Sequence, residues 1–494
     1  NLLNSNFINC ILTDGEHTWF GTETGGINLL NPRQLSIRSY RHDKENPSSL
    51  SYNPVNAIYE DAYGTLWVGT VEGGLNRKER NSEDFTHYTR EHGGLSHNSV
   101  SALTSDADNH LWIGTWGGGL NLLDLKAPRQ IQEVISSQTS GGFPINFIGV
   151  LNYDPINKGI WIGANQGLYF YDPIKKEITA PLPDKIAENI HGCIGSIIDK
   201  EGKLWVGCLE GVYIIDLHSR SSKGEFQYRH LNYKLDDPSS RLIEKITCFY
   251  EGKDGTLWLG SNGYGIYQRK IDAQGKEQFI SYSTAQGLPN NSVRGILEDN
   301  NGNLWISTNN GLSCYHQAEN RFINYTIQDG LIDTQFYWNA SCGSSHDLLY
   351  FGSVGGLVAI ESNRPAASLP AAKVRFTRLR IGNEEILPGS EYLSEDIAIT
   401  TELRLHEKEK SFSLEFAALN FESNNTAIYS YRLVGFDDKW VQVPGNRRFA
   451  SYTNLPPGSY ALQVRYTPDG ENEGENITEL KITIVPYFYK TVWF

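Results

Sequence analysis

The stretch Gly64-Thr65-Leu66-Trp67-Val68-Gly69-Thr70, followed directly by Val71-Glu72-Gly73-Gly74-Leu75, decides the fold of this chain. It predicts a turn, a short β-strand that ends in glycine, a second glycine-rich turn and the start of another strand. The pattern recurs with its tryptophan, or a phenylalanine in its place, at Trp19, Trp67, Trp112, Trp161, Trp205, Trp258, Trp305 and Phe351, in steps of 48, 45, 49, 44, 53, 47 and 46 residues. Repetition at this period indicates a β-propeller.

The third unit shows what one repeat contains. Strands are expected at residues 99–104, 111–115, 120–125 and 131–135, with polar turns such as Asp106-Ala107-Asp108-Asn109 between them. A single sheet of this size buries little, whereas sheets stacked around an axis bury both faces. A β-solenoid or a string of separate small domains is the alternative. We disfavour it because solenoid coils are shorter and separate domains need longer linkers.

A column of small residues supports the ring. Counted back from the turn aspartate, the third position of each first strand holds Cys10, Ala57, Ala102, Gly149, Gly195, Cys248 and Gly295. Blades converge on a propeller axis, so their innermost strands need such a column to approach closely. Eight units are visible. Either they close one ring, or seven close it and the remaining unit belongs to a neighbouring, truncated ring.

The repeat stops after Ile360, and a different β pattern follows. Residues 363–372 read as a linker, because their two prolines cannot join a strand ladder. Alternating β runs then occur at residues 374–381, 403–405, 412–416, 429–434, 459–466 and 480–485. We therefore predict an all-β chain, with a propeller of seven to eight four-stranded blades in residues 1–362 and an immunoglobulin-like β-sandwich in residues 373–494.

Composition and the absence of motifs narrow the function classes. The formal net charge of −14 argues against nucleic acid or an anionic membrane surface as the main partner. No nucleophile elbow, HExxH motif or phosphate loop occurs, so we expect no catalytic residues and no cofactor. The six cysteines form no CxxC motif and no Cys/His ligand spacing, so we expect no metal site. They are expected to be small buried residues, and a disulfide remains open for an oxidising compartment, although no pair is indicated.

Two sets of residues resemble known families. Residues 61–76 and 106–121 match the two-component regulator propeller repeat, whose pattern is Asp-x-x-Gly, then Leu-Trp-(Ile/Val)-Gly-Thr, then Gly-Gly-Leu-Asn. The C-terminal part resembles the Y_Y_Y domain, with Tyr431, Tyr452 and Tyr460 as its three tyrosines. Together the two resemblances cover almost the whole chain.

Propellers followed by a Y_Y_Y domain are similar to the periplasmic sensor half of hybrid two-component systems, typical of gut Bacteroidetes. The resemblance implies a homodimeric, non-enzymatic ectodomain of an inner-membrane histidine kinase, which senses an oligosaccharide and relays the signal through the sandwich. The family carries roughly twice as many repeats, in two rings. In the family a transmembrane helix follows the Y_Y_Y domain, so membrane contact is expected only through a helix after Phe494. This chain has only eight visible repeats and ends at Phe494, before any membrane helix. Both departures from the family pattern fit a truncated ectodomain.

Two other functions remain open. A polysaccharide lyase or hydrolase on a propeller would need a convergent cluster of His, Tyr or carboxylate side chains, but the 12 histidines share no repeat position. A propeller that serves only protein interaction is the other alternative.

Candidate ligand-binding residues are those that break the repeat. Trp116 and Tyr264 stand in glycine turns where no core position demands an aromatic ring, and Trp338 lies ahead of the last blade. Arg294 occupies a first-strand position that is Asn, Ser or Thr in other units. Exposed aromatic rings beside fixed polar groups suit sugar binding. The acidic net charge leans away from polyanionic glycans, although one basic pocket would overturn that.

Overall fold

The computed structural model describes most of the chain as two compact units, residues 1–366 and 367–494. The described residues are 3–5, 7–14, 17–30, 37–136, 138–139, 141–182, 190–209, 211–231, 245–272, 274–362, 373–382, 384–409, 411–418, 428–467, 477–487 and 489. The predicted linker, residues 363–372, lies outside them. Within the described residues, no helix is long and apolar enough to cross a membrane.

Seven antiparallel sheets of four strands form the blades of the first unit. Blade 1 contains β5 (Val55–Glu60), β6 (Leu66–Thr70), β7 (Leu75–Lys78) and β8 (Phe85–Tyr88). Blade 2 contains β9 (Val100–Ser105), β10 (His110–Thr115), β11 (Leu120–Asp124) and β12 (Gln132–Ile135). Blade 3 contains β13 (Ile148–Asp154), β14 (Gly159–Ala164), β15 (Gly167–Asp172) and β16 (Glu177–Thr179). Blade 4 contains β17 (Gly195–Ile198), β18 (Lys203–Cys208), β19 (Gly211–Asp216) and β20 (Gln227–Leu231).

The remaining blades follow the same order. Blade 5 contains β21 (Ile246–Glu251), β22 (Leu257–Ser261), β23 (Ile266–Ile271) and β24 (Glu277–Tyr282). Blade 6 contains β25 (Val293–Glu298), β26 (Leu304–Thr308), β27 (Gly311–His316) and β28 (Arg321–Tyr325). Blade 7 contains β29 (Phe336–Gly343), β30 (Leu348–Ser353), β31 (Gly356–Glu361) and β4 (Ile37–Tyr40). Short 3₁₀ turns, η2 (Thr284–Gln286) and η3 (Ile327–Asp329), precede blades 6 and 7.

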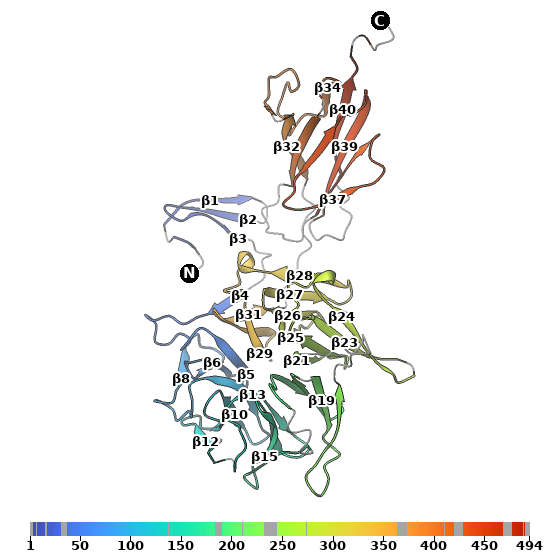
Figure 1. Ribbon diagram of the computed structural model, residues 1–494. Coiled ribbons are helices and arrows are strands. Elements are labelled where there is room, and N and C mark those ends of the chain that lie inside the picture. The colour runs from blue at the N-terminus through green and yellow to red at the C-terminus, as the bar shows by residue number, and fades with distance from the viewer. Residues whose placement is uncertain are drawn as a thin grey trace. The chain divides into compact units, whose positions relative to one another are not determined.

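The ring closes through β4, which comes from the start of the chain and supplies the outer strand of blade 7. β4 pairs antiparallel with β31, from Leu357 opposite Tyr40 to Ile360 opposite Ile37. Arg38 adds an ion pair to Glu361 at 2.8 Å. Figure 1 shows the blades around a common centre, with β5, β13, β21, β25 and β29 innermost. Seven of the eight sequence units therefore close the ring.

The eighth unit, at the N-terminus, forms a separate three-stranded sheet of β1 (Ile8–Asp14), β2 (His17–Thr22) and β3 (Gly26–Leu30). It has the register of a blade, with Cys10 opposite Gly21 as Ala57 is opposite Gly69 in blade 1. Its apolar side chains are exposed, however. Ile27 is 72% exposed, whereas the equivalent Leu75 is 0% exposed. This sheet is a blade whose apolar faces are not covered by neighbouring blades.

The six repeat tryptophans of the ring are buried in the cores between blades, and turn aspartates hold five of them in place. Asp61 accepts hydrogen bonds from the backbone N–H groups of Tyr63 and Thr65 and from the indole of Trp67, at 2.9, 3.0 and 2.8 Å. The same indole bond joins Asp106 to Trp112 (2.9 Å), Asp154 to Trp161 (3.1 Å), Asp199 to Trp205 (2.7 Å) and Asp299 to Trp305 (3.1 Å). These aspartates are structural, because each satisfies turn donors and a largely buried indole.

Close approach between blades explains the glycine that ends most second strands. A Cβ on Gly69 would lie 2.5 Å from a methyl carbon of Val100 in blade 2, far inside van der Waals contact. The predicted small column in the first strands is correct in six of its seven positions. It is wrong at Gly149, because Val150 stands opposite Gly163 and Gly149 is the unpaired residue of a bulge. Counted back from Asp154 by the same four residues as in the other units, the position is Val150, so the column is not small in blade 3.

The cysteines were expected to be buried, and the clear exception is Cys10 near the N-terminus. Four are buried and Cys342 is half-buried, but Cys10 is exposed because it lies in the uncovered β1–β3 sheet. The sulfur atoms of Cys193 and Cys208 lie 2.9 Å apart in the core between blades 3 and 4. Nothing in their spacing indicated this pair.

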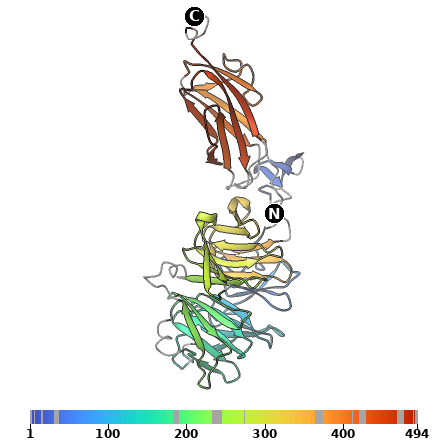
Figure 2. The same ribbon diagram turned by 90° about the vertical axis from the view of Figure 1, so that its right-hand side faces the viewer.

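The second unit is a sandwich of two sheets, one ordered β33-β32-β35-β38 and the other β34-β40-β39-β36-β37 (Figure 2). Its strands are β32 (Val374–Ile381), β33 (Glu384–Ile386), β34 (Glu402–His406), β35 (Ser411–Ala418), β36 (Ile428–Val434), β37 (Val441–Pro444), β38 (Phe449–Thr453), β39 (Gly458–Thr467) and β40 (Ile477–Val485). Tyr452, buried, donates to Asp437 at 2.8 Å, and Tyr460 donates to the carbonyl of Pro456 at 2.9 Å. Two of the three motif tyrosines thus fasten loops of the sandwich.

Candidate functional site

One face of the ring collects the turns between the second and third strands and the starts of the first strands. In every blade the residue after the second strand donates its N–H to the carbonyl of a residue just before or at the start of the first strand. These bonds, of 2.9–3.1 Å, start from Val71, Trp116, Asn165, Leu209, Asn262, Asn309 and Val354. We call the face that carries these seven residues the turn face.

All four candidates from the sequence belong to the turn face. Trp116 is itself one of the seven residues, and Tyr264 lies in the equivalent turn of blade 5. Arg294 is the second residue of β25, and Trp338 the third residue of β29. The repeat thus places on one face residues that are far apart in the chain.

Arg294 and Trp338 are in direct contact. The guanidinium carbon of Arg294 lies 4.9 Å from the centre of the Trp338 ring, within the range of a cation–π interaction. Arg294 Nη2 also donates to Asn309 Oδ1, at a long 3.4 Å. Arg294 is 8% exposed, whereas Trp338 is 37% exposed.

A wide bulge in β29 presents Trp338 to Arg294. Phe336 pairs with Ser353 and Ser341 with Phe351, so the four residues between them on β29 oppose a single residue of β30. Asn339 in this bulge has a φ of 52°, a left-handed conformation that is uncommon outside glycine. Bulges re-aim side chains, and backbone strain of this kind clusters at ligand-binding positions.

The charge of Arg294 has no acidic partner among the described residues. No ion pair forms to it, and its Nη1 is a buried nitrogen without a hydrogen-bond acceptor there. Burial lowers the pKa of Arg294, against a smaller opposing effect from the Cys248 thiol. The shift starts from so high a value that the guanidinium remains charged. A buried cation in this state is costly unless a counter-charge is supplied.

Trp116 and Tyr264 are separate from this pair. Trp116 forms a backbone bridge with Phe147, which is 55% exposed, and Tyr264 is 41% exposed on blade 5. Sequence reasoning missed Phe147 and Leu209, which expose 55% and 57% of their surface on the same face. Alignment of the turns could have found Leu209, because it follows a second strand as Trp116 does.

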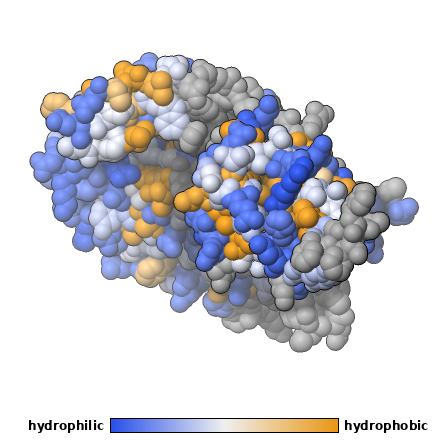
Figure 3. All heavy atoms as spheres, turned by 90° about the horizontal axis from the view of Figure 1, so that it is seen from above, coloured by the Kyte–Doolittle hydropathy of each residue, from blue (hydrophilic) through white to orange (hydrophobic). Residues whose placement is uncertain are grey.

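Figure 3 shows the surface of the molecule seen from above the view of Figure 1. On that side, exposed hydrophobic residues form small groups among hydrophilic ones.

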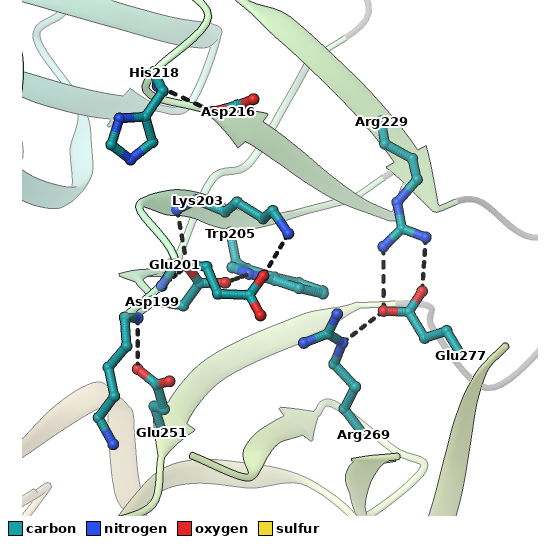
Figure 4. Close-up of polar contacts among 11 residues, drawn as sticks. Asp199, Glu201, Lys203, Trp205, Asp216, His218, Arg229, Glu251, Arg269 and Glu277 are labelled. Carbon is teal, nitrogen blue, oxygen red and sulfur yellow. Dashed lines mark hydrogen bonds and ion pairs between the residues drawn. The ribbon is translucent and has the colours of Figure 1, made fainter. Parts of the chain in front are cut away.

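A hollow of 380 Å³, away from the turn-face candidates, lies between the outer strands of blades 4 and 5 and was not predicted. Glu277 sits between two arginines there, accepting from Arg229 at 2.7 Å and from Arg269 at 2.6 Å (Figure 4). The guanidinium of Arg269 lies 5.0 Å from the ring centre of Trp205. Glu277 and the two arginines are already paired with one another, so we interpret the hollow as a junction between blades.

The described residues contain no group of three or more His, Cys, Asp or Glu side chains that could hold a metal ion. The turn face therefore offers aromatic rings, a buried cation and backbone groups. Such a set can bind a ligand.

Comparison with known proteins agrees with this architecture. The profile of the two component regulator propeller matches residues 49–72, 94–117, 242–263 and 287–310, and the Y_Y_Y domain profile matches residues 420–485. The extracellular domain of the hybrid two component system BT3049 from B. thetaiotaomicron superposes with a TM-score of 0.78 at 27% identity. The superposition covers 98% of this chain and 62% of that domain.

Histidine kinase P4 of Formosa agariphila is 27% identical over 303 residues, which are 60% of this chain and 21% of the kinase. The chain thus spans about a fifth of this curated relative and less than two thirds of the solved ectodomain. Its similarity to the kinase and to the ectodomain relates it to the extracellular part of hybrid two-component sensors.

Proposed function

We propose that this chain is the ligand-sensing ectodomain of a hybrid histidine kinase. It combines two component regulator propeller repeats with a Y_Y_Y domain. The observation that carries this proposal is the match to a sensor ectodomain over 98% of the chain. In this proposal the domain lies in the periplasm and acts as a homodimer. In this proposal the sandwich passes the signal on towards the membrane-anchored kinase.

The ligand in this proposal is an oligosaccharide that binds on the turn face. Trp116, Tyr264 and Trp338 support this, because aromatic rings give the apolar faces of sugars a flat surface to stack on. Binding biases the dimer between two arrangements, and it can do so only by the difference in affinity for the two.

The β1–β3 sheet supports a further part of the proposal. We interpret it as the last blade of a preceding ring, because its apolar side chains are exposed and Ile27 exposes 72% of its surface where the ring blades bury the equivalent residue. Blades of that ring would cover these side chains. The 62% coverage of the solved ectodomain leaves room for such a ring.

Calorimetric titration of the chain with oligosaccharide pools, with product analysis of the same mixtures, tests the proposed function. Saturable binding without cleavage supports a sensor. Release of new reducing or unsaturated ends would instead support a hydrolase or lyase. Failure of every pool to bind, with the protein folded, would refute oligosaccharide sensing by this chain.

A further inference from the structure

We infer that Arg294 is the anion-binding residue of a site on the turn face and that the site takes an acidic oligosaccharide. In this arrangement a carboxylate or sulfate group of the sugar pairs with the guanidinium, and Trp338 contacts the adjoining sugar ring. The inference rests on the proposed function and specifies its ligand class.

The position of Arg294 in the repeat is the first argument. It is the unpaired bulge residue of its first strand, between Val293 opposite Thr308 and Gly295 opposite Ser307. In blades 1, 2 and 5 this residue is Asn, Ser or Thr, and its side chain ties neighbouring first strands together. Asn56 donates to the carbonyl of Val100 (3.3 Å), Ser101 to Ile148 (2.5 Å) and Thr247 to Val293 (2.7 Å). Arg294 makes no such bond within the described residues, so the requirements of the fold do not explain it.

The missing counter-charge is the second argument. Neighbours of Arg294 supply one long hydrogen bond, from its Nη2 to Asn309, and the face of the Trp338 ring. Its Nη1 is buried and unpartnered, and no carboxylate of the described residues pairs with it. By contrast, Arg269 of the blade 4–5 hollow, which also lies over a tryptophan ring, is paired with Glu277 at 2.6 Å. An anion at Arg294 would supply charge and acceptors that the chain itself does not.

The side chain that would move on binding is Trp338. Its indole lies against the guanidinium and Nη1 is buried, so in this arrangement the ligand displaces the indole to reach that nitrogen. Trp338 lies in the four-residue bulge of β29, next to Asn339 with its φ of 52°. Because bulged residues are held by fewer ladder hydrogen bonds, the indole can shift at lower cost than one in a regular strand. Once displaced, its 37% exposed ring remains beside the site as a platform for a sugar.

The chemistry of the pair selects the ligand class. Guanidinium forms two parallel hydrogen bonds with a planar carboxylate and also binds sulfate. An uronic acid or a sulfated sugar carries such an anion on a ring that can stack on tryptophan. A neutral sugar would leave the buried charge uncompensated. The formal net charge of −14 does not oppose this reading, because short-range pairing at a buried site is screened less than distant surface charges.

The test is calorimetric titration of the whole chain with three probes: oligogalacturonides, the same oligosaccharides with methyl-esterified carboxyls, and sulfated carrageenan oligosaccharides. The esterified probe keeps the sugar rings and removes the charge. We expect at least one acidic probe to bind, with the ester weaker by roughly 10- to 100-fold. Comparison of the carboxylate and sulfate probes identifies the source of the anion.

Variants locate the site. Arg294→Gln is expected to weaken the acidic probe by the same roughly 10- to 100-fold, and Arg294→Lys to weaken it less, because lysine keeps the charge without the fork. Arg404→Gln, at an arginine whose side chain is 74% exposed in the sandwich, is the matched control and should bind as the unaltered chain does. Ligand-induced change in tryptophan fluorescence should be lost in Trp338→Phe, which keeps an aromatic ring.

Equal binding of the acidic probe by the chain and by folded Arg294→Gln would overturn the inference. So would equal affinity for the free acid and its methyl ester, or failure of both acidic probes to bind. If Arg294→Gln does not fold, the unaltered chain provides the test. The inference is then overturned when an acidic probe binds to that chain without changing the fluorescence of Trp338. Tight binding of a neutral oligosaccharide alone would leave the proposed sensor function standing while removing this site.

Discussion

Trp112 donates its indole N–H to a carboxylate oxygen of Asp106 at 2.9 Å, across the turn that joins the first two strands of blade 2. The other carboxylate oxygen accepts the backbone N–H groups of Asp108 and His110, both at 2.9 Å. One side chain thus fastens a turn and orients the largest residue of the blade core. This explains why aspartate recurs at this position in five of the blades.

Asp106→Ala should destabilise the ring. The substitution leaves the indole and turn donors without an acceptor, and we expect a loss of about 2–4 kcal/mol of unfolding free energy. Asp108→Ala, two residues away, is the control, because the Asp108 carboxylate is exposed and accepts no hydrogen bond from the described residues. Urea unfolding monitored by circular dichroism measures both. Similar losses in the two variants would contradict the structural role of Asp106.

Leu75→Ala and Ile27→Ala form a matched pair at the same position of two repeats. Leu75 is 0% exposed, so its truncation should cost about 2–5 kcal/mol. Ile27 is 72% exposed, so its truncation should change the unfolding free energy by less than about 0.5 kcal/mol. A large loss for Ile27→Ala in this chain would show that the β1–β3 sheet is covered in solution.

Removal of β4 should open the ring, whereas removal of the residues before it should not. A chain that begins at residue 37 keeps the pairing of β4 with β31, and we expect its ring to unfold as in the whole chain. A chain that begins at residue 41 loses this pairing and the contact of Tyr40 with Phe85, whose ring centres lie 5.6 Å apart. It should be less stable by about 2–4 kcal/mol. Equal denaturant midpoints for the two chains would show that β4 does not hold the ring closed.

The pair of Cys193 and Cys208 should oxidise to a disulfide. Their sulfurs are 2.9 Å apart and buried together, and the proposed periplasmic location is an oxidising compartment. Treatment with oxidised glutathione should remove two alkylatable thiols without joining chains, and for a loop of this size stabilise the fold by about 3 kcal/mol. Mass spectrometry after alkylation checks the thiol count. Cys193→Ser should abolish the change, whereas Cys314→Ser should not.

Acid should weaken the junction of blades 4 and 5. Burial raises the pKa of Glu277, but hydrogen bonds from Arg229 and Arg269 outweigh it, so the pKa lies below its ordinary value. A carboxyl with a depressed pKa stabilises the fold above its ordinary pKa, near 4.3, and this contribution is lost as the pH falls through the lowered value. The unfolding free energy should therefore decline below about pH 4, and less steeply in Glu277→Gln. Parallel pH profiles for the two proteins would contradict this role.

Sequence periodicity predicted the ring because most blades repeat the same physical needs: a glycine where blades approach, a buried tryptophan, and a turn aspartate that holds it. It left the number of blades open, because β1–β3 has the same local pattern as a true blade and only its exposure distinguishes it. Likewise Arg294 and Trp338 could each be selected as exceptions to the repeat. Their contact could not be predicted, because it depends on a bulge in β29 that the spacing of residues does not encode.

The antiparallel pairing of β4 with β31 has a mechanical consequence. The chain enters the ring at Ile37 and leaves it at Ile360, and these two residues are paired partners at one end of the same two strands. Tension applied between the two connecting segments would therefore peel β4 from β31 one hydrogen bond after another, starting at the Arg38–Glu361 ion pair. Until that seam opens, the force crosses a gap of one strand spacing, about 5 Å, and the six other blades carry none of it.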